Sequence, residues 1–319
     1  MKFLYPFAKR FIAGPDIKTA VPAIRKIQQS GYFTSIDILG ESVSTRQQAE
    51  DAKIEYLKLC ESLDSINHSF DFSIKLSQLG LDIDRKFCID NLKQLAQSMG
   101  NHTIRLDMEG SAHTQNTLEI CEEVHRTHPH IGQAIQAYLF RSKNDVRRCI
   151  ENGISLRLCK GAYKEPTDIA LQSMDEIRAN FLKLAYQLLK EGHQPSIATH
   201  DENLLVKLLD FITQEKIEPE SFYFEMLYGV RRDLQKILKE KGYRVRIYTP
   251  YGKAWLPYTL RRLVEKKENL LFVITHLFRE TLGRSFHSLQ IFMGNPTGLH
   301  SNGFLNAAAE NHDFSQRFF

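Results

Sequence analysis

The stretch Phe72-Ser73-Ile74-Lys75-Leu76-Ser77 puts apolar residues on one face of a strand and polar residues on the other, with the period of two of a β-strand. A helical pattern over 84–99 follows it, and the same strand-then-helix unit recurs along the chain. The strand candidate that contains this stretch lies near 70–77, and the others lie near 33–39, 103–109, 133–140, 154–160, 195–199, 221–227 and 244–248. Helical patterns include 44–64, 114–126, 167–191, 201–215 and 229–241. Eight such units predict an α/β fold with a closed parallel barrel, and alternation alone leaves a doubly wound sheet as the alternative.

Polar residues also recur at alternate positions of the later strands. Arg105 and Asp107 alternate with apolar neighbours, as do Arg157, Arg246 and Tyr248. Because helices separate the strands, the apolar face should contact the outer helices and the polar face should point into the barrel. Charges inside a barrel are costly unless they are paired or used on a ligand. These residues fall late in their strands, where barrel enzymes build their sites, so the pattern predicts a polar site there.

The bulk composition is that of one globular domain. The 319 residues fit a single α/β barrel, which commonly needs about 250 residues plus insertions. We expect one barrel domain over 1–319, with a helical lead-in over about 1–30 and an aromatic extension over about 280–319. The net charge of +4 is spread along the chain, which argues against nucleic acid as the main partner. The five cysteines form no C-x-x-C pair, and no leader or membrane-spanning run is evident, so we expect a cytoplasmic protein.

The segment 258–265, Tyr-Thr-Leu-Arg-Arg-Leu-Val-Glu, has its polar residues at i, i+3, i+4 and i+7, on one face of a helix. Two guanidiniums beside a tyrosine can grip a planar carboxylate through paired charge-assisted hydrogen bonds. Taken alone, the segment is more typical of a solvated surface helix, since surface arginines are the norm. Its place after the eighth strand favours the first interpretation, because such a helix can fold over the barrel mouth where Lys75, Asp107 and Arg157 converge.

Eight segments in order resemble the catalytic domain of the proline dehydrogenase family, as found also in bifunctional proline utilisation proteins. They include Arg-Leu-Asp-Met-Glu at 105–109, Arg-Leu-Cys-Lys-Gly-Ala-Tyr at 157–163 and Tyr-x-x-Arg-Arg at 258–262. The others are 72–80, 136–138, 198–200, 224–229 and 246–248. The resemblance covers about 33–275 and implies a distorted (βα)8 barrel of the TIM type, with the last helix over the barrel mouth.

The resemblance also implies a reaction and a cofactor. L-proline would be oxidised to Δ1-pyrroline-5-carboxylate by hydride transfer to FAD, in the first step of proline catabolism to glutamate. The flavin would be bound without a Gly-rich dinucleotide fingerprint, and no G-x-G-x-x-G follows a strand here. No metal is expected.

The family's functional positions carry over residue by residue. Asp107, Arg157 and Tyr248 match the catalytic positions; Asp107 would balance the cationic group, Arg157 would lie near the reactive flavin nitrogen and Tyr248 would pack on the proline ring. The substrate-binding positions are Lys75, Leu227, Tyr258, Arg261 and Arg262. The cofactor-binding positions are Met108, Gln136, Arg157, Lys160, Gly161, Ala162, Tyr163, Thr199, His200, Glu225 and Glu265. The two arginines and Lys75 would hold the carboxylate, and three cations can do so firmly where water is excluded.

Some positions have a structural alternative. Gln136 can be a satisfied amide of the barrel interior, since buried polar groups usually find partners. Glu225 can pair with Arg246 instead of touching the flavin. His200 can cap the next helix. The set His113, His125, His128 and His130 suggests a metal site, but it lies on a polar helix and its exit without a thiolate, which favours a solvated face.

The resemblance further implies a membrane quinone or another electron acceptor, and peripheral contact with the inner face of the membrane is a hypothesis. The chain is too short for the aldehyde dehydrogenase domain that some relatives carry, so a separate Δ1-pyrroline-5-carboxylate dehydrogenase would take the product. Two rival functions are hydroxyproline oxidation and a binding barrel without turnover. A bulky Tyr248 argues against the first, because it would crowd an added hydroxyl. The intact charged positions argue against the second.

Overall fold

Eight parallel strands close into a barrel in the order of the sequence. The structure is a computed structural model that describes residues 5–64, 66, 68–100 and 102–264. The strands are β1 (Phe33–Ile38), β2 (Asp71–Ile74), β3 (Thr103–Leu106), β4 (Ile131–Gln136), β5 (Leu156–Cys159), β6 (Ser196–Ala198), β7 (Tyr223–Leu227) and β8 (Val245–Tyr251). Closure comes from β1 and β8, which pair with Ser35 opposite Tyr248. The predicted closed barrel is therefore confirmed, and the doubly wound sheet is excluded.

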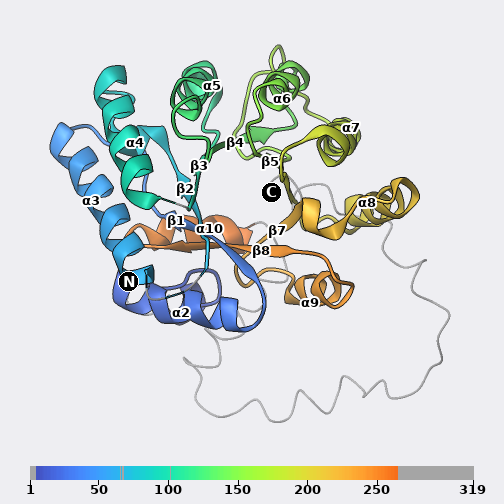
Figure 1. Cartoon of the computed structure of the whole chain (residues 1–319), viewed down its shortest axis with the longest axis horizontal. Coiled ribbons are helices and arrows are strands. Elements are labelled where there is room, and N and C mark those ends of the chain that lie inside the picture. Colours follow the sequence, from blue (N-terminus) through green and yellow to red (C-terminus); the bar gives the residue numbers. More distant parts are fainter. Residues whose placement is uncertain (1–4, 65, 67, 101, 265–319) are drawn as a thin grey trace, which may run out of the picture.

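Helices surround the barrel as a ring (Figure 1). Its members are α2 (Ile17–Gln29), α3 (Arg46–Leu63), α4 (Arg85–Met99), α5 (Ser111–His125), α6 (Ser142–Glu151), α7 (Met174–Glu191), α8 (Glu202–Glu215) and α9 (Arg232–Glu240). Shorter elements are α1 (Tyr5–Ala8), η2 (Leu76–Leu79) and η3 (Pro219–Ser221). The last helix in the described chain, α10 (Trp255–Val264), projects onto the barrel opening, inside the ring (Figure 1).

Local signals explain where the helices begin. Thr45 caps α3 through a capping box, in which its side chain accepts from the Gln48 backbone and Gln48 reaches back. Asp84, Ser173 and Asp201 cap α4, α7 and α8 by accepting from backbone N–H groups of the first turn. These caps fix where each helix leaves its loop and thus how each loop crosses the barrel rim.

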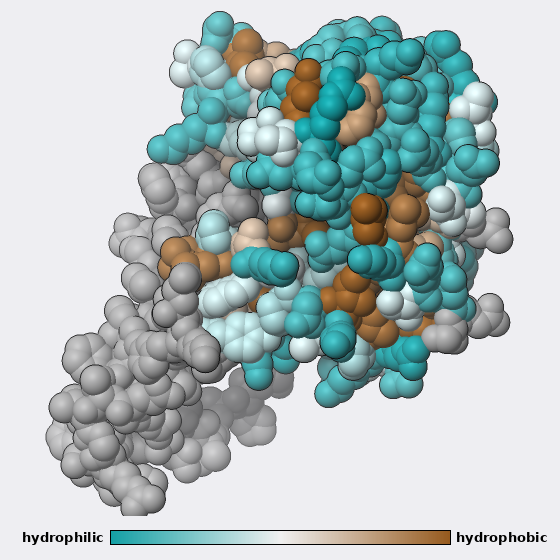
Figure 2. All heavy atoms as spheres, turned by 90° about the vertical axis from the view of Figure 1, so that its left-hand side faces the viewer, coloured by the Kyte–Doolittle hydropathy of each residue, from teal (hydrophilic) through white to brown (hydrophobic). Residues whose placement is uncertain are grey.

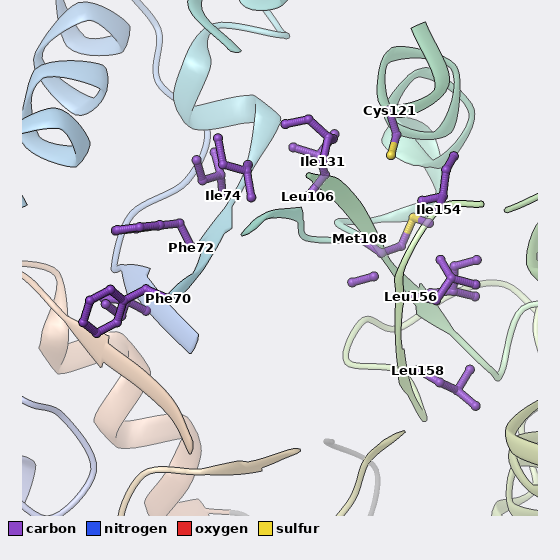
Figure 3. Packing of buried hydrophobic residues seen from close by; sticks show 14 of the residues in the cluster. Phe70, Phe72, Ile74, Leu106, Met108, Cys121, Ile131, Ile154, Leu156 and Leu158 are labelled. Carbon is purple, nitrogen blue, oxygen red and sulfur yellow. The ribbon is translucent and has the colours of Figure 1, made fainter. Parts of the chain in front are cut away.

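The apolar core fills the layer between the strands and the helices. Phe72 and Ile74 of β2, Leu106 of β3 and Leu156 of β5 are completely or almost completely buried. Figure 3 shows these side chains with Cys121, which points from α5 toward the strands. Burying such side chains contributes roughly 1.5–3 kcal/mol each. The polar faces of the same strands point the other way, into the barrel, as the alternation predicted.

Several element boundaries differ from the predicted ones. The second and third strands end at Ile74 and Leu106, earlier than expected, because the chain turns there into η2 and into the loop before α5. The fourth strand spans Ile131–Gln136 instead of 133–140. The seventh helix begins at Met174 instead of 167, because Ser173 is its cap and Leu139 pairs with Ala170 in an isolated bridge just before it.

The face of the molecule shown in Figure 2 is mainly hydrophilic, with hydrophobic residues in small separate groups. Among the helices of the described chain, none combines the length and apolar character that crossing a bilayer requires. The aromatic extension over 280–319 lies outside the described residues.

Candidate active site

Asp107, the first residue after β3, receives hydrogen bonds from four side chains. Its Oδ1 accepts from Ser73 Oγ at 2.6 Å and from Arg157 Nη1 at 2.7 Å. Its Oδ2 accepts from the Tyr248 hydroxyl at 3.1 Å and from Lys75 Nζ at 3.3 Å. Burial alone would raise the pKa of Asp107, but Lys75 and Arg157 outweigh it and hold that pKa below its ordinary value. These five residues, the Asp107 cluster, therefore surround an ionised carboxylate.

The Asp107 cluster reaches solvent at the carboxyl ends of the strands. Lys75 and Asp107 come directly after β2 and β3, and each side chain is 14% exposed. Arg157, on β5, lies deeper, with a side chain only 3% exposed. The two solvent-reaching members thus sit where (βα)8 enzymes bind their substrates.

Lys75 bridges two carboxylates from neighbouring strands. Its Nζ lies 2.9 Å from Oδ1 of Asp37, near the end of β1, as well as 3.3 Å from Oδ2 of Asp107. Burial would lower the pKa of Lys75, but Asp37, Tyr248 and Asp107 raise it well above its ordinary value. Lys75 is therefore a cation throughout the physiological range, held in place from two sides.

Arg157 occupies the centre of the barrel and is a permanent cation. Its Nε forms an ion pair with Glu225 Oε1 at 2.8 Å, and its Nη2 lies 3.4 Å from Oδ1 of Asp71. Its Cζ is 5.0 Å from the centre of the Tyr248 ring, within cation–π range. Burial would lower the pKa of Arg157, but Glu225, Asp107 and Asp71 raise it. Glu225 thus pairs with Arg157, and the alternative pairing with Arg246 is not found among the described residues.

A second charged layer lies beneath the cluster, toward the amino ends of the strands. Arg105 donates to Oδ2 of Asp71 from both Nε and Nη2, at 3.0 and 2.8 Å. Arg246 Nη1 lies 3.3 Å from the same oxygen and donates to Ser196 Oγ at 2.6 Å. Burial would raise the pKa of Asp71, but Arg105, Arg246 and Arg157 together lower it far below its ordinary value. Asp71 therefore joins this layer to Arg157 and, through it, to the Asp107 cluster.

Comparison with known proteins identifies the family to which this arrangement belongs. The sequence model of the family described as proline dehydrogenase matches residues 20–275. The chain belongs to the proline dehydrogenase family. Proline dehydrogenase 1 of Bacillus subtilis (strain 168) is 31% identical over 275 residues, which cover 86% of this chain and 91% of the relative. Proline dehydrogenase of Deinococcus radiodurans is 33% identical over 284 residues, with the same two coverages.

A solved structure supports the same membership at the level of the fold. The chain is similar to proline utilization A (PutA) from Bdellovibrio bacteriovorus, whose crystal structure shows the protein inactivated by N-propargylglycine. The TM-score is 0.76 at 25% sequence identity, and the match covers 84% of this chain and 34% of that one. The barrel described above is thus shared with about a third of that longer protein.

The predicted cofactor positions of this family member lie along the carboxyl ends of β4, β5 and β6. Gln136, at the end of β4, donates to the Glu109 carbonyl at 3.1 Å and accepts from the Ala162 N–H at 2.7 Å. Both hydrogen bonds of its amide are thus made within the chain, which agrees with the structural alternative given for Gln136. The bond to Ala162 also fixes the turn after β5. Gly161 lies in this turn at φ +138°, and an added Cβ would lie 2.2 Å from the Tyr138 ring. Close packing on Tyr138 is therefore one reason for this glycine.

The next positions are held by polar contacts of their own. Lys160 Nζ lies 3.3 Å from Asp201 Oδ2, which also accepts from Arg178 Nε at 2.9 Å. His200 Nε2 accepts from the Leu227 N–H at 2.9 Å. The residue that caps α8 is Asp201, so His200 is not that cap. Thr199, almost fully buried, accepts from the Asp201 backbone at 3.1 Å.

The remaining predicted positions have the following places. Met108 is 7% exposed and packs in the main core (Figure 3). Tyr163 is half-buried beside the mouth, and burial raises its pKa. Tyr258 packs in α10 against Ala8, Phe11 and Ile12 of the amino-terminal segment, so its role as a pocket wall stays a prediction. Arg261 and Arg262 lie in α10, but their side chains fall outside the described part of the chain, as does the whole of Glu265.

The four histidines for which a metal site was the less favoured interpretation do not form a group of metal ligands over the described residues. His113 contacts Asp82, His125 the Ile131 carbonyl and His130 the Ala96 carbonyl. Over the described residues, the one cluster with suitable ligand types is Cys60, Asp64 and His102. There, His102 Nδ1 accepts from the Phe70 N–H at 3.3 Å, which leaves the proton on Nε2. This ring would have to turn before it could bind a metal.

Sequence reasoning gave no role to three residues that support the site. They are Asp37, Asp71 and Glu109. Asp37 and Asp71 are 2% exposed, and each neutralises a cation that the sequence had singled out. Glu109 is 4% exposed and binds Ser77 through its hydroxyl and its backbone N–H. Asp37 and Asp71 stand at alternate positions of their strands, facing inward, and this signal was available before the structure.

Proposed function

We propose that this chain is an FAD-dependent L-proline dehydrogenase, which oxidises L-proline to Δ1-pyrroline-5-carboxylate. The observation that carries the proposal is the Asp107 cluster, in which Lys75, Arg157 and Tyr248 converge on one carboxylate at the substrate end of the barrel. Family membership gives this cluster its substrate, because the relatives named above are proline dehydrogenases.

The charge of the cluster suits an amino acid that carries both signs. Lys75 offers a fixed ammonium to the proline carboxylate, and Asp37 and Asp107 hold it from the other side. Arg261 and Arg262 on α10 would complete the grip, since guanidinium forks match a carboxylate in shape and charge. Asp107 would offset these cations and attract the positive nitrogen of the substrate. Coulombic attraction of this kind is strongest where a closing helix excludes water.

The residues around the mouth also fit a flavin. The permanent charge of Arg157 lies below the mouth, in contact with Asp107, and would favour an electron-rich partner above it. Gln136, Lys160 and Thr199 lie at the ends of the neighbouring strands β4, β5 and β6, and Ala162, in the turn after β5, is exposed. FAD, when bound there, supplies the hydride acceptor. The protein's part is to orient proline against it and to exclude water.

Tyr248 would define the wall of the pocket that faces the proline ring. Burial, reinforced by Asp107, raises the pKa of Tyr248 well above its ordinary value, so the phenol keeps its proton and donates a hydrogen bond to Asp107. The ring is also fixed over Arg157. A phenol held from two sides cannot move aside for an added hydroxyl, which favours proline over hydroxyproline.

Spectroscopy of the purified protein tests the proposal. The protein should be yellow, and anaerobic addition of L-proline should bleach the flavin absorption while releasing a product two hydrogens lighter. A colourless protein, or a yellow one that is indifferent to proline, would show that the barrel serves another purpose. Stronger bleaching by hydroxyproline than by proline would reverse the assignment of the substrate.

We further infer from the family resemblance that the electrons pass to a membrane quinone and that a separate Δ1-pyrroline-5-carboxylate dehydrogenase consumes the product. Peripheral contact with the inner membrane face would then bring the reduced enzyme to its acceptor. Quinone analogues should reoxidise the bleached enzyme faster than dioxygen does. Sedimentation with anionic lipid vesicles measures the membrane contact directly.

A further inference from the structure

A cavity of about 280 Å³ opens at the amino ends of the strands, the end of the barrel opposite to the Asp107 cluster. Thr34 of β1, Arg105 of β3, Tyr223 of β7 and Arg246 of β8 line it. The exposed His68 and His193 stand on loops at its rim. Lys75, Asp107 and Tyr248 are not among the lining residues, so this cavity, here the lower cavity, is separate from the proposed active site.

The charged lining of the lower cavity has a surplus of positive charge. Two guanidiniums, those of Arg105 and Arg246, face it, whereas Asp71 is the only acidic residue in the lining. Both arginines contact the same oxygen of Asp71, and the other oxygen faces Arg157. Arg157 also has Glu225 and Asp107 as partners, so the two guanidiniums of the lining share one carboxylate between them. A buried positive charge without its own counter-charge is costly, and an anion in the cavity would remove that cost.

Arg246 itself lacks a partner at one donor. The residue is 7% exposed, and its Nε, although buried, has no hydrogen-bond partner among the described residues. Its Nη1 is used by Ser196 and Asp71, while its Cζ lies 3.8 Å from the centre of the Tyr223 ring, which fixes the plane of the guanidinium. The hydroxyl of Thr34 in the same lining also has no hydrogen-bond partner within the described part of the chain. Buried donors of this kind are normally satisfied, so the site is built for a polar guest.

We propose that the lower cavity binds a small oxyanion, a carboxylate or phosphate group, through Arg246 and Arg105. The volume would hold roughly nine waters at about 30 Å³ each, and therefore also an anion of a few heavy atoms. A cation would be repelled by two guanidiniums, and an apolar molecule would leave their donors without hydrogen bonds, so neither class of ligand suits the site. A carboxylate or phosphate matches the flat, multidentate geometry of a guanidinium.

Thermal unfolding of the holoenzyme in matched ionic strength tests the proposal. Replacing chloride by inorganic phosphate in one series, and by acetate in another, should raise Tm with increasing anion concentration, because a ligand of the folded state stabilises it. A rise with phosphate alone identifies a phosphate-type ligand, and a rise with acetate alone identifies a carboxylate. No rise with either anion beyond chloride overturns the proposal.

Variants locate the binding. The anion-dependent rise should persist in Lys75→Met, which removes the cation at the opposite end, and disappear in Arg246→Gln. His193→Glu keeps the buried layer intact and should weaken anion binding about threefold, because it adds one negative charge at the solvated rim of the cavity. Asn144→Glu adds the same charge on α6, outside the lining, and should bind as the unchanged protein does. The proposal fails if Lys75→Met abolishes the rise, or if His193→Glu and Asn144→Glu behave alike.

Crystallography gives the direct answer. A holoenzyme crystal soaked in selenate, a phosphate mimic with an anomalous signal, should show a peak within hydrogen-bond distance of Arg246. Selenate bound only at Lys75 or on the outer surface would assign the anion effect to another site.

Discussion

Arg157 Nη1 lies 2.7 Å from Oδ1 of Asp107, so that the middle of β5 is tied to the end of β3 across the barrel. Both residues make further contacts. Asp107 accepts hydrogen bonds from Lys75 and Tyr248. Arg157 forms an ion pair with Glu225 and lies close to Asp71. The solvent-reaching cation of the mouth is therefore positioned by charges that lie deep inside the barrel. Most of the expected effects of mutation follow from this arrangement.

Asp107→Asn should lower kcat/KM for proline by about 10²–10³-fold, since a neutral amide leaves Lys75 and Arg157 without the carboxylate they share and breaking a buried charge pair costs roughly 3–5 kcal/mol. Part of that loss will appear as a lower Tm, because the same network supports the fold. Steady-state kinetics and thermal unfolding on one preparation separate the two effects. Asp90→Asn on the exposed side of α4 serves as the control. If the kinetic constants of Asp107→Asn equal those of the control, Asp107 has no role in the active site.

Asp37→Asn should raise KM for proline about tenfold, which corresponds to roughly 1.4 kcal/mol, with little change in flavin content. Asp37 contacts Lys75 at 2.9 Å and acts as a positioning residue, since its loss frees the ammonium to turn away from the substrate carboxylate. Titration with proline and the flavin absorption of the resting enzyme give the two readouts. A drop in kcat at unchanged KM would instead show that Asp37 acts on the chemical step.

Arg261→Met should raise KM for proline far more than it lowers flavin content, because this residue is predicted to hold the substrate carboxylate. Lys267→Met, a change of the same kind six positions later in the sequence, should have little effect on either quantity. Equal losses of flavin and of proline affinity in Arg261→Met would mean that the helix serves the structure of the barrel mouth.

Asp71 should make the protein sensitive to acid. The folded-state pKa of Asp71 lies below its unfolded value of about 3.9, so the unfolded state binds more protons as the pH falls. Its stabilisation is therefore complete above about pH 4 and is lost as the pH falls further toward the folded pKa. Asp37 and Glu109, whose pKa values burial raises, act in the opposite direction.

A comparison of variants isolates the Asp71 contribution from those of the other carboxylates. Asp71→Asn should lower Tm strongly at pH 7, and the difference from the unchanged protein should shrink between pH 4 and pH 3. Asp51→Asn, on the exposed surface of α3, should show a small difference that does not depend on pH. A Tm difference for Asp71→Asn that stays constant over this range would contradict the assigned pKa shift.

Gly161→Ala should destabilise the protein by about 3 kcal/mol or more, because the new methyl would meet the Tyr138 ring at 2.2 Å in a backbone conformation that L-residues rarely adopt. Gly153→Ala is the matched control: its φ is +68°, but nothing lies within 4 Å, so only the backbone cost of roughly 1–2 kcal/mol applies. Denaturant unfolding measures both. The second change Tyr138→Leu should recover part of the loss in Gly161→Ala, and equal losses in the two alanine variants would rule out the clash.

Much of the fold was predictable because its signal is local. A strand is recognised by its alternation and a helix by its period and cap, so all eight strands could be placed within a few residues. The helices were predicted less completely: α6 had no predicted range, and α7 begins at Met174 instead of 167. The ends of β2 and β3 were less predictable, since Lys75 and Asp107 continue the alternating pattern although the chain has already left the sheet. There, side-chain contacts across the barrel outweigh the local preference for a strand.

Sequence by itself determined the barrel, the family and the polar residues that point inward, because periodicity and motif order depend only on neighbours along the chain. Only the tertiary structure decided which charge meets which: that Glu225 pairs with Arg157, that Asp37 holds Lys75, and that Asp71 is shared by three arginines. Closure of the barrel brings together residues more than 30 positions apart. Which partner each charge finds then depends on strand register and on the cost of burying a charge alone.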